Sequence, residues 1–543
     1  MLRKTVALFM VLVTFLCLFT ACSDGADEDF YYPIYADPVS FDPQIASDNA
    51  SKIVVFNCFE GLVRNDENGK IIPGVANSWK ISPDGLVYTF YLRGDSKWYM
   101  SQYAKELLDE ESAESFNYNV IAEDFVYGLK RAFDPVMGAV TDSRLYSIKN
   151  AYDVYTGKKT PDELGVTAIN SSTLQITLSE PDEDFLNALT QSAAMPCREE
   201  FFLATKGRYG LDPEKVIYNG PFYLYSWSTG SHLVLYRNEN YSGEADVKPS
   251  ALFLYINSDL STRVSKLVDG VYSACPLSVR QKETINDKDV TYIGYRNSTW
   301  GFCFNCADEL LSDYNMRSAL TASLDVTKLP MPSFCNGYAD GLVPDICMTG
   351  NTSYRSRAGK VSLPVTNTSQ AKKYLALAFE DLDIKNATLN IICPESFENT
   401  VKIAVQNWQS VLGVHLNFVV EPLDEVTLDK RVKNRDFDIA FTKITAESQS
   451  VVSFLGMFTS SSSANIFDFK SKKYDSLMGI ADETLSQDTL LSNCAEAEQH
   501  LTDMSVFLPV FSEDSFLGLA DDVSGVYCVE AGTVPIFCNG VAK

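Results

Sequence analysis

The stretch of residues 389–420 constrains the fold most, because its hydrophobic pattern changes period twice. An apolar run from Leu389 to Cys393 has the length of a buried strand. Apolar residues then recur at helical spacing from Val401 to Leu412, and Gly413 follows as a helix stop signal. Strand-like alternation resumes at Leu416. A strand, an amphipathic helix and a second strand form a βαβ unit, so we expect an α/β fold with a mainly parallel sheet here.

The first third of the chain alternates turn signals with short hydrophobic elements. Asn68-Gly69 is a strong hairpin signal, and Pro83-Asp84-Gly85 is a further turn. After that turn, residues 86–93 alternate in polarity as in a strand buried on one face. Apolar residues from Phe125 to Phe133 share one face of a helix. We therefore expect short strands, reverse turns and one amphipathic helix in this part of the chain.

Several short motifs stand in a fixed order along the chain. They are Phe41-Asp42-Pro43, Gly74-Val75-Ala76-Asn77-Ser78-Trp79, Tyr218-Asn219-Gly220-Pro221, Arg317-Ser318-Ala319-Leu320 and Arg435-Asp436-Phe437-Asp438-Ile439-Ala440. In this order and spacing the chain resembles the family 5 extracellular solute-binding proteins, the oligopeptide and dipeptide receptors of ABC importers. The resemblance runs from about Phe41 to Ser512. It departs at residues 99–119, where an acidic insertion is expected to form a surface loop or short helix.

The resemblance implies an α/β, two-lobed periplasmic-binding-protein-like fold of type II, in its large peptide-binding subclass, with an extra α+β subdomain inserted in lobe I. The expected boundaries are 1–21 for a lipoprotein signal peptide, 22–30 for a lipidated tether, 31–57, 190–265 and 505–543 for lobe I, 58–189 for its inserted subdomain, and 266–504 for lobe II. The chain is expected to cross between lobes near 260–268 and 498–508, which would form the hinge. Ligand binding in the cleft would then drive closure.

The N-terminus has the pattern of a secretory leader. Arg3 and Lys4 precede an apolar run, Val6 to Phe19, that is too short to span a membrane comfortably. The ending up to Cys22 resembles a bacterial lipobox, in which the leader is removed and Cys22 receives a lipid. We expect the protein on the outer face of the cytoplasmic membrane, on the extracellular or periplasmic side. An ordinary signal peptide or a single membrane anchor is the alternative.

Charge and cysteine content limit the partners. The formal charge of −26 becomes −28 when Arg3 and Lys4 leave with the leader, so nucleic acid is not an expected partner. Of thirteen cysteines, eleven remain without Cys17 and Cys22, an odd number that leaves at least one thiol unpaired within the chain. Cys528 and Cys538 are near enough in sequence for a local disulfide. Free buried cysteines in a reducing habitat are the alternative.

The resemblance also implies an anion for a peptide's amino terminus. In peptide-binding relatives, a Trp-x-Ala-Asp-Tyr-like segment supplies an Asp that pairs with the ligand's α-ammonium group. Here Ile444 replaces the Trp, Glu447 stands at the Asp and Ser448 at the Tyr. An ammonium group closed away from water needs an anion, which Glu447 can supply. The alternative for Glu447 is a solvated loop carboxylate.

Three further residues complete the predicted ligand-binding set. Trp300 precedes a strand motif that lines the groove in the family, so it either stacks on a ligand or packs in the core. The Asn219 backbone faces the cleft in the family, and its side chain either contacts ligand or fixes the turn. Asp48 is the third residue of this set.

No catalytic, cofactor or metal motif competes with a binding role. The chain has no Gly-Lys-Ser/Thr phosphate loop, no Gly-x-Ser-x-Gly elbow and no His-Glu-x-x-His motif. Cys303 and Cys306 would point to opposite faces of a strand, and only three histidines are present, so neither a metal nor another cofactor is expected.

We therefore expect a monomeric, non-enzymatic receptor that captures oligopeptides and delivers them to an ABC permease. The alternatives are a receptor for a sugar oligomer, an opine-like compound or a metal chelate, a secreted lipoprotein hydrolase, and a sensing protein that kept the fold without transport.

Overall fold

The computed structural model describes residues 29–542 apart from 138–142, 183–184, 244, 246, 286–289, 350–351, 364, 447–448, 463 and 484–486. The predicted leader, Cys22, Glu447 and Ser448 lie outside the described residues. Within the part that is described, no helix combines the length and apolar character needed to cross a membrane.

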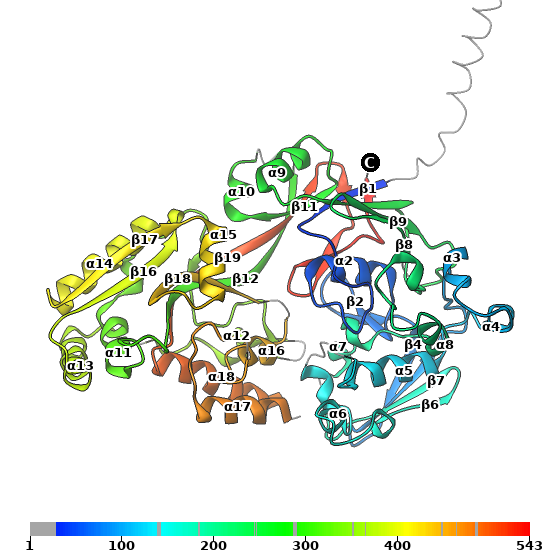
Figure 1. Ribbon diagram of the computed structural model, residues 1–543, viewed down its shortest axis with the longest axis horizontal. Coiled ribbons are helices and arrows are strands. Elements are labelled where there is room, and N and C mark those ends of the chain that lie inside the picture. The colour runs from blue at the N-terminus through cyan, green and yellow to red at the C-terminus, as the bar shows by residue number, and fades with distance from the viewer. Residues whose placement is uncertain are drawn as a thin grey trace, which may run out of the picture.

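The first lobe is built on a four-stranded sheet in the order β1-β10-β9-β8, on the right of Figure 1. Its strands are β1 (Asp29–Ile34), β8 (Phe222–Ser228), β9 (His232–Arg237) and β10 (Ala251–Ile256). β1 is parallel to β10, and the other pairs are antiparallel. Helix α2 (Asn49–Cys58) packs against β8. The C-terminal segment adds the hairpin of β21 (Tyr527–Val529) and β22 (Val534–Ile536), and the pair of β20 (Val523–Ser524) and β23 (Val541–Ala542).

A second four-stranded sheet belongs to the segment predicted as an inserted subdomain. It is antiparallel, in the order β4 (Ala76–Ile81), β5 (Val87–Leu92), β7 (Thr173–Thr177) and β6 (Val166–Asn170). Alternate residues of β5 are buried, as the sequence predicts. Helix α5 (Ala122–Phe133) packs on this sheet. The shorter helices here are α3 (Gln102–Lys105), α4 (Glu110–Ser115), α6 (Ala151–Tyr155), α7 (Phe185–Ala188) and α8 (Glu199–Ala204).

The predicted hairpin at Asn68-Gly69 is confirmed. It joins β2 (Val63–Asn65) to β3 (Ile71–Pro73), and Gly69 adopts a φ of 77°, which favours glycine. The acidic insertion at residues 99–119 contains α3 and α4, in agreement with the expected short helical structure.

The second lobe holds a seven-stranded sheet in the order β11-β19-β12-β18-β16-β17, with β13 also on β19. The strands are β11 (Ala274–Ser278), β12 (Val290–Phe304), β13 (Gly337–Tyr338), β16 (Ala387–Pro394), β17 (Leu416–Leu423), β18 (Ile439–Thr445) and β19 (Phe507–Ala520), and β14 (Met348–Thr349) pairs with β15 (Thr352–Ser353). The helices after β10 are α9 (Leu260–Val268), α10 (Val279–Glu283), α11 (Tyr314–Ser323), α12 (Tyr354–Ala358), α13 (Thr368–Asp381), α14 (Glu398–Leu412), α15 (Glu425–Lys433), α16 (Val451–Gly456), α17 (Lys472–Glu483) and α18 (Gln487–Asp503).

The predicted βαβ unit is confirmed, but the prediction of a mainly parallel sheet is wrong. β16 and β17 are parallel and are connected through α14. β12, however, is antiparallel to both β18 and β19, and β11 and β13 also pair antiparallel with β19. The sheet is mixed because two long strands from distant parts of the chain insert into it, which a local pattern does not reveal.

The long strands β12 and β19 connect the two lobes (Figure 1). Val290 and Leu517 lie in the core of the first lobe, whereas Phe302 and Leu508 lie in a core of the second. The pairing register of the two strands shifts between Tyr295 and Ser298, in the region between these cores. In α9, at the predicted first crossing, Leu267 still packs in the first core. The core therefore changes later along the chain than the predicted boundary at 265, and the other domain boundaries stay predictions.

Candidate functional site

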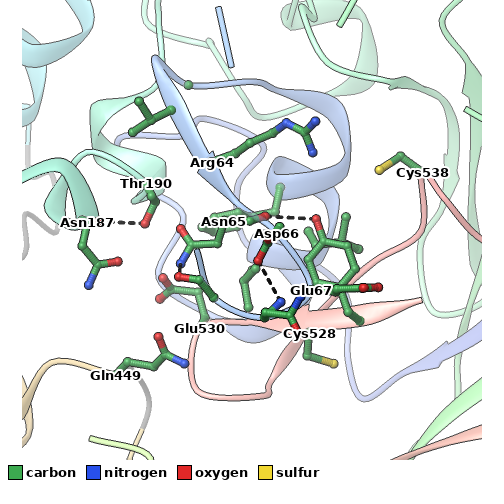
Figure 2. Close-up of a pocket in the computed structure, with 18 of the residues that line it drawn as sticks. Arg64, Asn65, Asp66, Glu67, Asn187, Thr190, Gln449, Cys528, Glu530 and Cys538 are labelled. Atoms are coloured by element: carbon green, nitrogen blue, oxygen red, sulfur yellow. Dashed lines mark hydrogen bonds between the residues drawn. The ribbon is translucent and has the colours of Figure 1, made fainter. Parts of the chain in front are cut away.

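A pocket of about 440 Å³ lies where the connecting strand β12 passes between the lobes, and we call it the interlobe pocket. On the first-lobe side its lining includes residues 59–61 and 63–69, Asn187, Thr190 and residues 527–530. The second lobe contributes Asp345, Ile346 and Gln449, and residues 294–296 of β12 lie between. Figure 2 shows Gln449 approaching the pocket from the side opposite Arg64, with Glu530 between them in this view. The volume suits a small solute or short peptide.

A buried carboxylate, Glu60, anchors the first-lobe wall. Glu60 is 4% exposed. Its carboxylate accepts hydrogen bonds from the guanidinium of Arg93 and from the hydroxyl of Tyr241, the latter at 2.6 Å. Arg64 Nε lies 3.7 Å from the same carboxylate. Burial raises the pKa of Glu60, and Arg93 is the largest opposing influence. These partners satisfy the Glu60 charge within the protein, so it is fixed in the wall.

The β2–β3 hairpin forms the rim of the same wall. Asp66 Oδ1 accepts the backbone N–H groups of Asn68 and Lys70 at 2.8 and 2.9 Å, which closes the turn. The Tyr527 hydroxyl donates to the backbone carbonyl of Asn65 at 3.1 Å (Figure 2). The rim is therefore tied to the C-terminal β21–β22 hairpin, although the two are far apart in sequence.

Asn219 lies outside the pocket lining. It is 1% exposed, its Nδ2 donates to the Glu60 carbonyl at 2.8 Å, and its Oδ1 accepts the Glu60 N–H at 3.1 Å. Both ends of the amide are thus used to hold the Glu60 backbone. This geometry favours the turn-fixing interpretation, and a ligand contact by Asn219 stays a prediction.

Trp300 also lies outside the pocket lining and packs in the second core. Its indole N–H donates to Glu513, and its ring stacks on Phe441 with centroids 5.9 Å apart. The ammonium group of Lys443 lies 5.4 Å from the Trp300 ring centroid. The residue is 6% exposed, so little of the ring is available to a ligand.

Asp48 is the N-cap of helix α2. Its carboxylate accepts the backbone N–H of Ser51 at 2.9 Å and the N–H of Val39 at 3.3 Å. Its position gives it a helix-capping role, and it is absent from the pocket lining. The structure therefore does not bring Asp48, Asn219 and Trp300 together in one site.

None of the predicted ligand-binding residues that the structure describes lines the pocket, and Gln449, Arg296 and Glu530 are among the lining residues that the sequence did not predict. Gln449 directly follows the predicted segment 444–448. Arg296 pairs with Asp345, its Nη1 lying 3.3 Å from Oδ2, across β12 and the second-lobe loop. Glu530 lies in the C-terminal hairpin, beyond the last family motif used. Only Gln449 had a sequence signal, its adjacency to Glu447 and Ser448.

The cysteines act as buried side chains in this structure. Cys528 and Cys538 are both free, so the local disulfide considered from the sequence is not formed. Burial raises the pKa of Cys303 well above its usual value, and that of Cys306 to about 11. In the ranges that the structure describes, no group of three or more His, Cys, Asp or Glu side chains is placed to hold a metal ion.

Comparison with known proteins identifies the family. Residues 70–465 match the profile of the bacterial extracellular solute-binding proteins, family 5 (middle part). The chain belongs to this family. The match covers well over half of the chain and includes parts of both lobes.

Individual relatives agree with this membership. The chain is 26% identical over 507 residues to the dipeptide-binding protein of Lactococcus lactis, covering 89% of this chain and 88% of that protein. It is 28% identical over 486 residues to the periplasmic murein peptide-binding protein MppA of Escherichia coli, covering 88% and 86%. The structure of Listeria monocytogenes OppA bound to peptide superposes with a TM-score of 0.72 at 23% identity, covering 96% and 100%. This likeness shows the shared two-lobed α/β fold.

Proposed function

We propose that this family 5 solute-binding protein is the receptor of an ABC importer and that it captures oligopeptides in the interlobe pocket. The observation that carries the proposal is the lining of that pocket, which comes from both lobes and from the strand that connects them. A ligand in such a place contacts both lobes only when they are closed, so binding favours the closed state. The names of the relatives from Lactococcus lactis and Escherichia coli support peptide as the ligand class.

The hinge in this proposal is the pair of strands β12 and β19. Their register shift between Tyr295 and Ser298 interrupts regular pairing next to the pocket. Gly294, Tyr295 and Arg296 line the pocket at the same place. A ligand that touches these residues would therefore bias the hinge directly.

Glu447 is proposed as the partner of a peptide's α-ammonium group, with Ser448 beside it. The support is that Gln449, the next residue, lines the pocket, and that Ala446 is tied to β12 by its N–H, which donates to the Asn297 carbonyl at 2.8 Å. Both ends of the segment are thereby held close to the pocket. An anion at this place would compensate an ammonium group that closure removes from water.

The proposal includes a lipid on Cys22, a monomeric state and docking of the closed form on a membrane permease powered by a cytoplasmic ATPase. The lipobox-like ending supports the anchor, and membership in an extracellular solute-binding family supports its location outside the cytoplasmic membrane. A receptor role without catalysis is consistent with the family.

Calorimetric titration with tetra-alanine tests the ligand class. The account expects saturable binding to the protein from Ser23 onward, and Glu447→Ala should weaken free tetra-alanine far more than its N-acetylated form. Equal loss for both forms would refute the Glu447 assignment. Absence of binding by a mixed peptide library, together with binding of a sugar oligomer, an opine-like compound or a metal chelate, would replace peptide with that class.

A further inference from the structure

The C-terminal hairpin presents a second carboxylate, Glu530, to the interlobe pocket. Glu530 lines the pocket, and its side chain is 12% exposed. Its ion-pair partner is Lys52, whose Nζ lies 3.4 Å from Oε2 and whose side chain is 22% exposed. Among the described residues, Oε1 of Glu530 accepts no hydrogen bond. The carboxylate is therefore largely removed from water but only partly compensated.

The backbone at Glu530 is held in an unusual conformation. Glu530 and the following Ala531 have φ values of 50° and 55°, in the left-handed region that non-glycine residues seldom adopt. Two such residues in succession cost free energy, and conformations of this kind persist only where the surroundings enforce them. Strain of this sort concentrates at binding sites, because it holds a side chain where a relaxed turn would not place it.

The surroundings of the turn enforce this conformation from two sides. The Thr533 hydroxyl donates to the Glu530 carbonyl at 2.6 Å, and Asn49 Nδ2 donates to the Thr533 carbonyl at 2.9 Å. From β12, the Tyr295 ring packs on Gly532 so closely that a Cβ there would lie 2.2 Å from it. The turn is thus fixed both to helix α2 and to the connecting strand. Its carboxylate has a defined position beside the hinge.

Three other carboxylates of the pocket are better compensated than Glu530, whereas Glu67 is exposed to water. Glu60 is satisfied by Arg93 and Tyr241, and Asp345 pairs with Arg296. The Asp66 carboxylate accepts two backbone N–H groups of its own turn. A second cation lowers the free energy most for a partly buried anion that has only one weak ion-pair partner, because desolvation without compensation is costly.

We propose that Glu530 binds the side-chain ammonium group of a lysine in the ligand. The inference rests on the proposed function of the pocket and adds a preference for cationic peptides. Lys52, being partly exposed, occupies the carboxylate in the empty state and turns to solvent when the ligand's cation arrives. Glu530 then acts as a specificity-determining residue of the site.

The test uses calorimetric titration of the protein from Ser23 onward with defined tetrapeptides. The probes are tetra-alanine, its N-acetylated form, the four single-lysine variants of tetra-alanine, and the four matching norleucine variants, which keep the length of the side chain without its charge. The native chain should prefer at least one cationic probe over its neutral match by about tenfold. Loss of the preference when lysine is exchanged for norleucine assigns it to the side-chain ammonium group, whereas N-acetylation reports on the separate Glu447 contact.

Two variants and one control assign the preference to Glu530. Glu530→Gln should abolish it while leaving the affinity for the neutral probes within about twofold. Lys52→Gln, which removes the competing cation, should increase it. Glu200→Gln is the control, because Glu200 is exposed and lies outside the pocket lining, and it should leave the preference intact. Thermal unfolding checks that each variant is folded.

Four results would overturn the inference. An unchanged preference in Glu530→Gln, or a decrease in Lys52→Gln, would show that Glu530 is not the partner. Binding of neutral and cationic probes with equal affinity to the native chain would remove this inference and leave the proposed function standing. Absence of binding by every probe would remove both.

Discussion

Replacement of Asn219 by alanine should loosen the wall of the pocket without removing a ligand contact. The Asn219 amide makes two hydrogen bonds to the Glu60 backbone, at 2.8 and 3.1 Å, and both residues are buried. Alanine would leave the N–H and the carbonyl of Glu60 unpaired away from water. Each unsatisfied buried group costs about 1–3 kcal/mol, so the change should cost about 2–6 kcal/mol.

Hydrogen exchange measured by mass spectrometry detects this loss of stability at the affected part of the chain. Peptic fragments that contain Glu60 should exchange at least roughly 30-fold faster in Asn219→Ala than in the native chain, since that ratio corresponds to about 2 kcal/mol. Fragments from the second lobe, such as those of α14, should exchange at the native rate. Asn240→Ala is the control, because Asn240 is exposed and its change should leave the fragments around Glu60 unaffected.

The same variant separates the two interpretations of Asn219. If its amide serves only the backbone of Glu60, peptide affinity should fall in step with the loss of protection in the first-lobe wall. Unchanged exchange around Glu60 together with a large loss of affinity would refute this reasoning. It would show that the Asn219 side chain contacts the ligand.

Three further predictions concern other parts of the chain. Trp300→Phe should destabilise the protein by about 1.5–3 kcal/mol, because the hydrogen bond to Glu513 is lost. Peptide affinity should stay unchanged, and a selective loss of affinity would make Trp300 a ligand contact. A thiol reagent at pH 8 should modify few thiols of the native protein, because burial raises their pKa values. After unfolding in urea, the reagent should modify all eleven cysteines from Cys58 onward, and fewer adducts would reveal disulfides. Hydrogen bonds from Thr262 and Ser261 lower the pKa of Asp259 to about 2, so its stabilising effect is present above about pH 4 and is lost as the pH falls towards 2. The thermal midpoint of the native chain should therefore fall relative to that of Asp259→Asn over this range, and parallel pH profiles would contradict the assignment.

The local elements of the fold could be predicted from the sequence because their determinants are close together in the chain. The hairpin at Gly69 and the one-sided burial of β5 depend on patterns within about a dozen residues, and the βαβ unit through α14 depends on the pattern within residues 389–420. The mixed sheet could not be predicted in this way, because β12 and β19 are separated by about two hundred residues.

The candidate site, like the fold, could be predicted only in part from the sequence. Trp300 and Asn219 were selected from motifs, but the groups that use their polar atoms, Glu513 and Glu60, lie 213 and 159 residues away in the chain. Their burial and hydrogen bonds could therefore be known only from the fold. Glu530 was missed because a strained turn of two non-glycine residues has no sequence signature. The segment before Gln449 was selected from a family motif, and Gln449 itself lines the pocket, whereas the roles of Glu447 and Ser448 stay predictions.

Native mass spectrometry of the chain from Ser23 onward tests the central claim most directly. The protein would be purified without denaturation, and whatever it releases on unfolding would be identified. We expect a set of short peptides, enriched in lysine relative to a digest of the host's proteins. A single non-peptide compound, or an empty protein that no peptide library stabilises against heat, would contradict the claim that the interlobe pocket binds peptides.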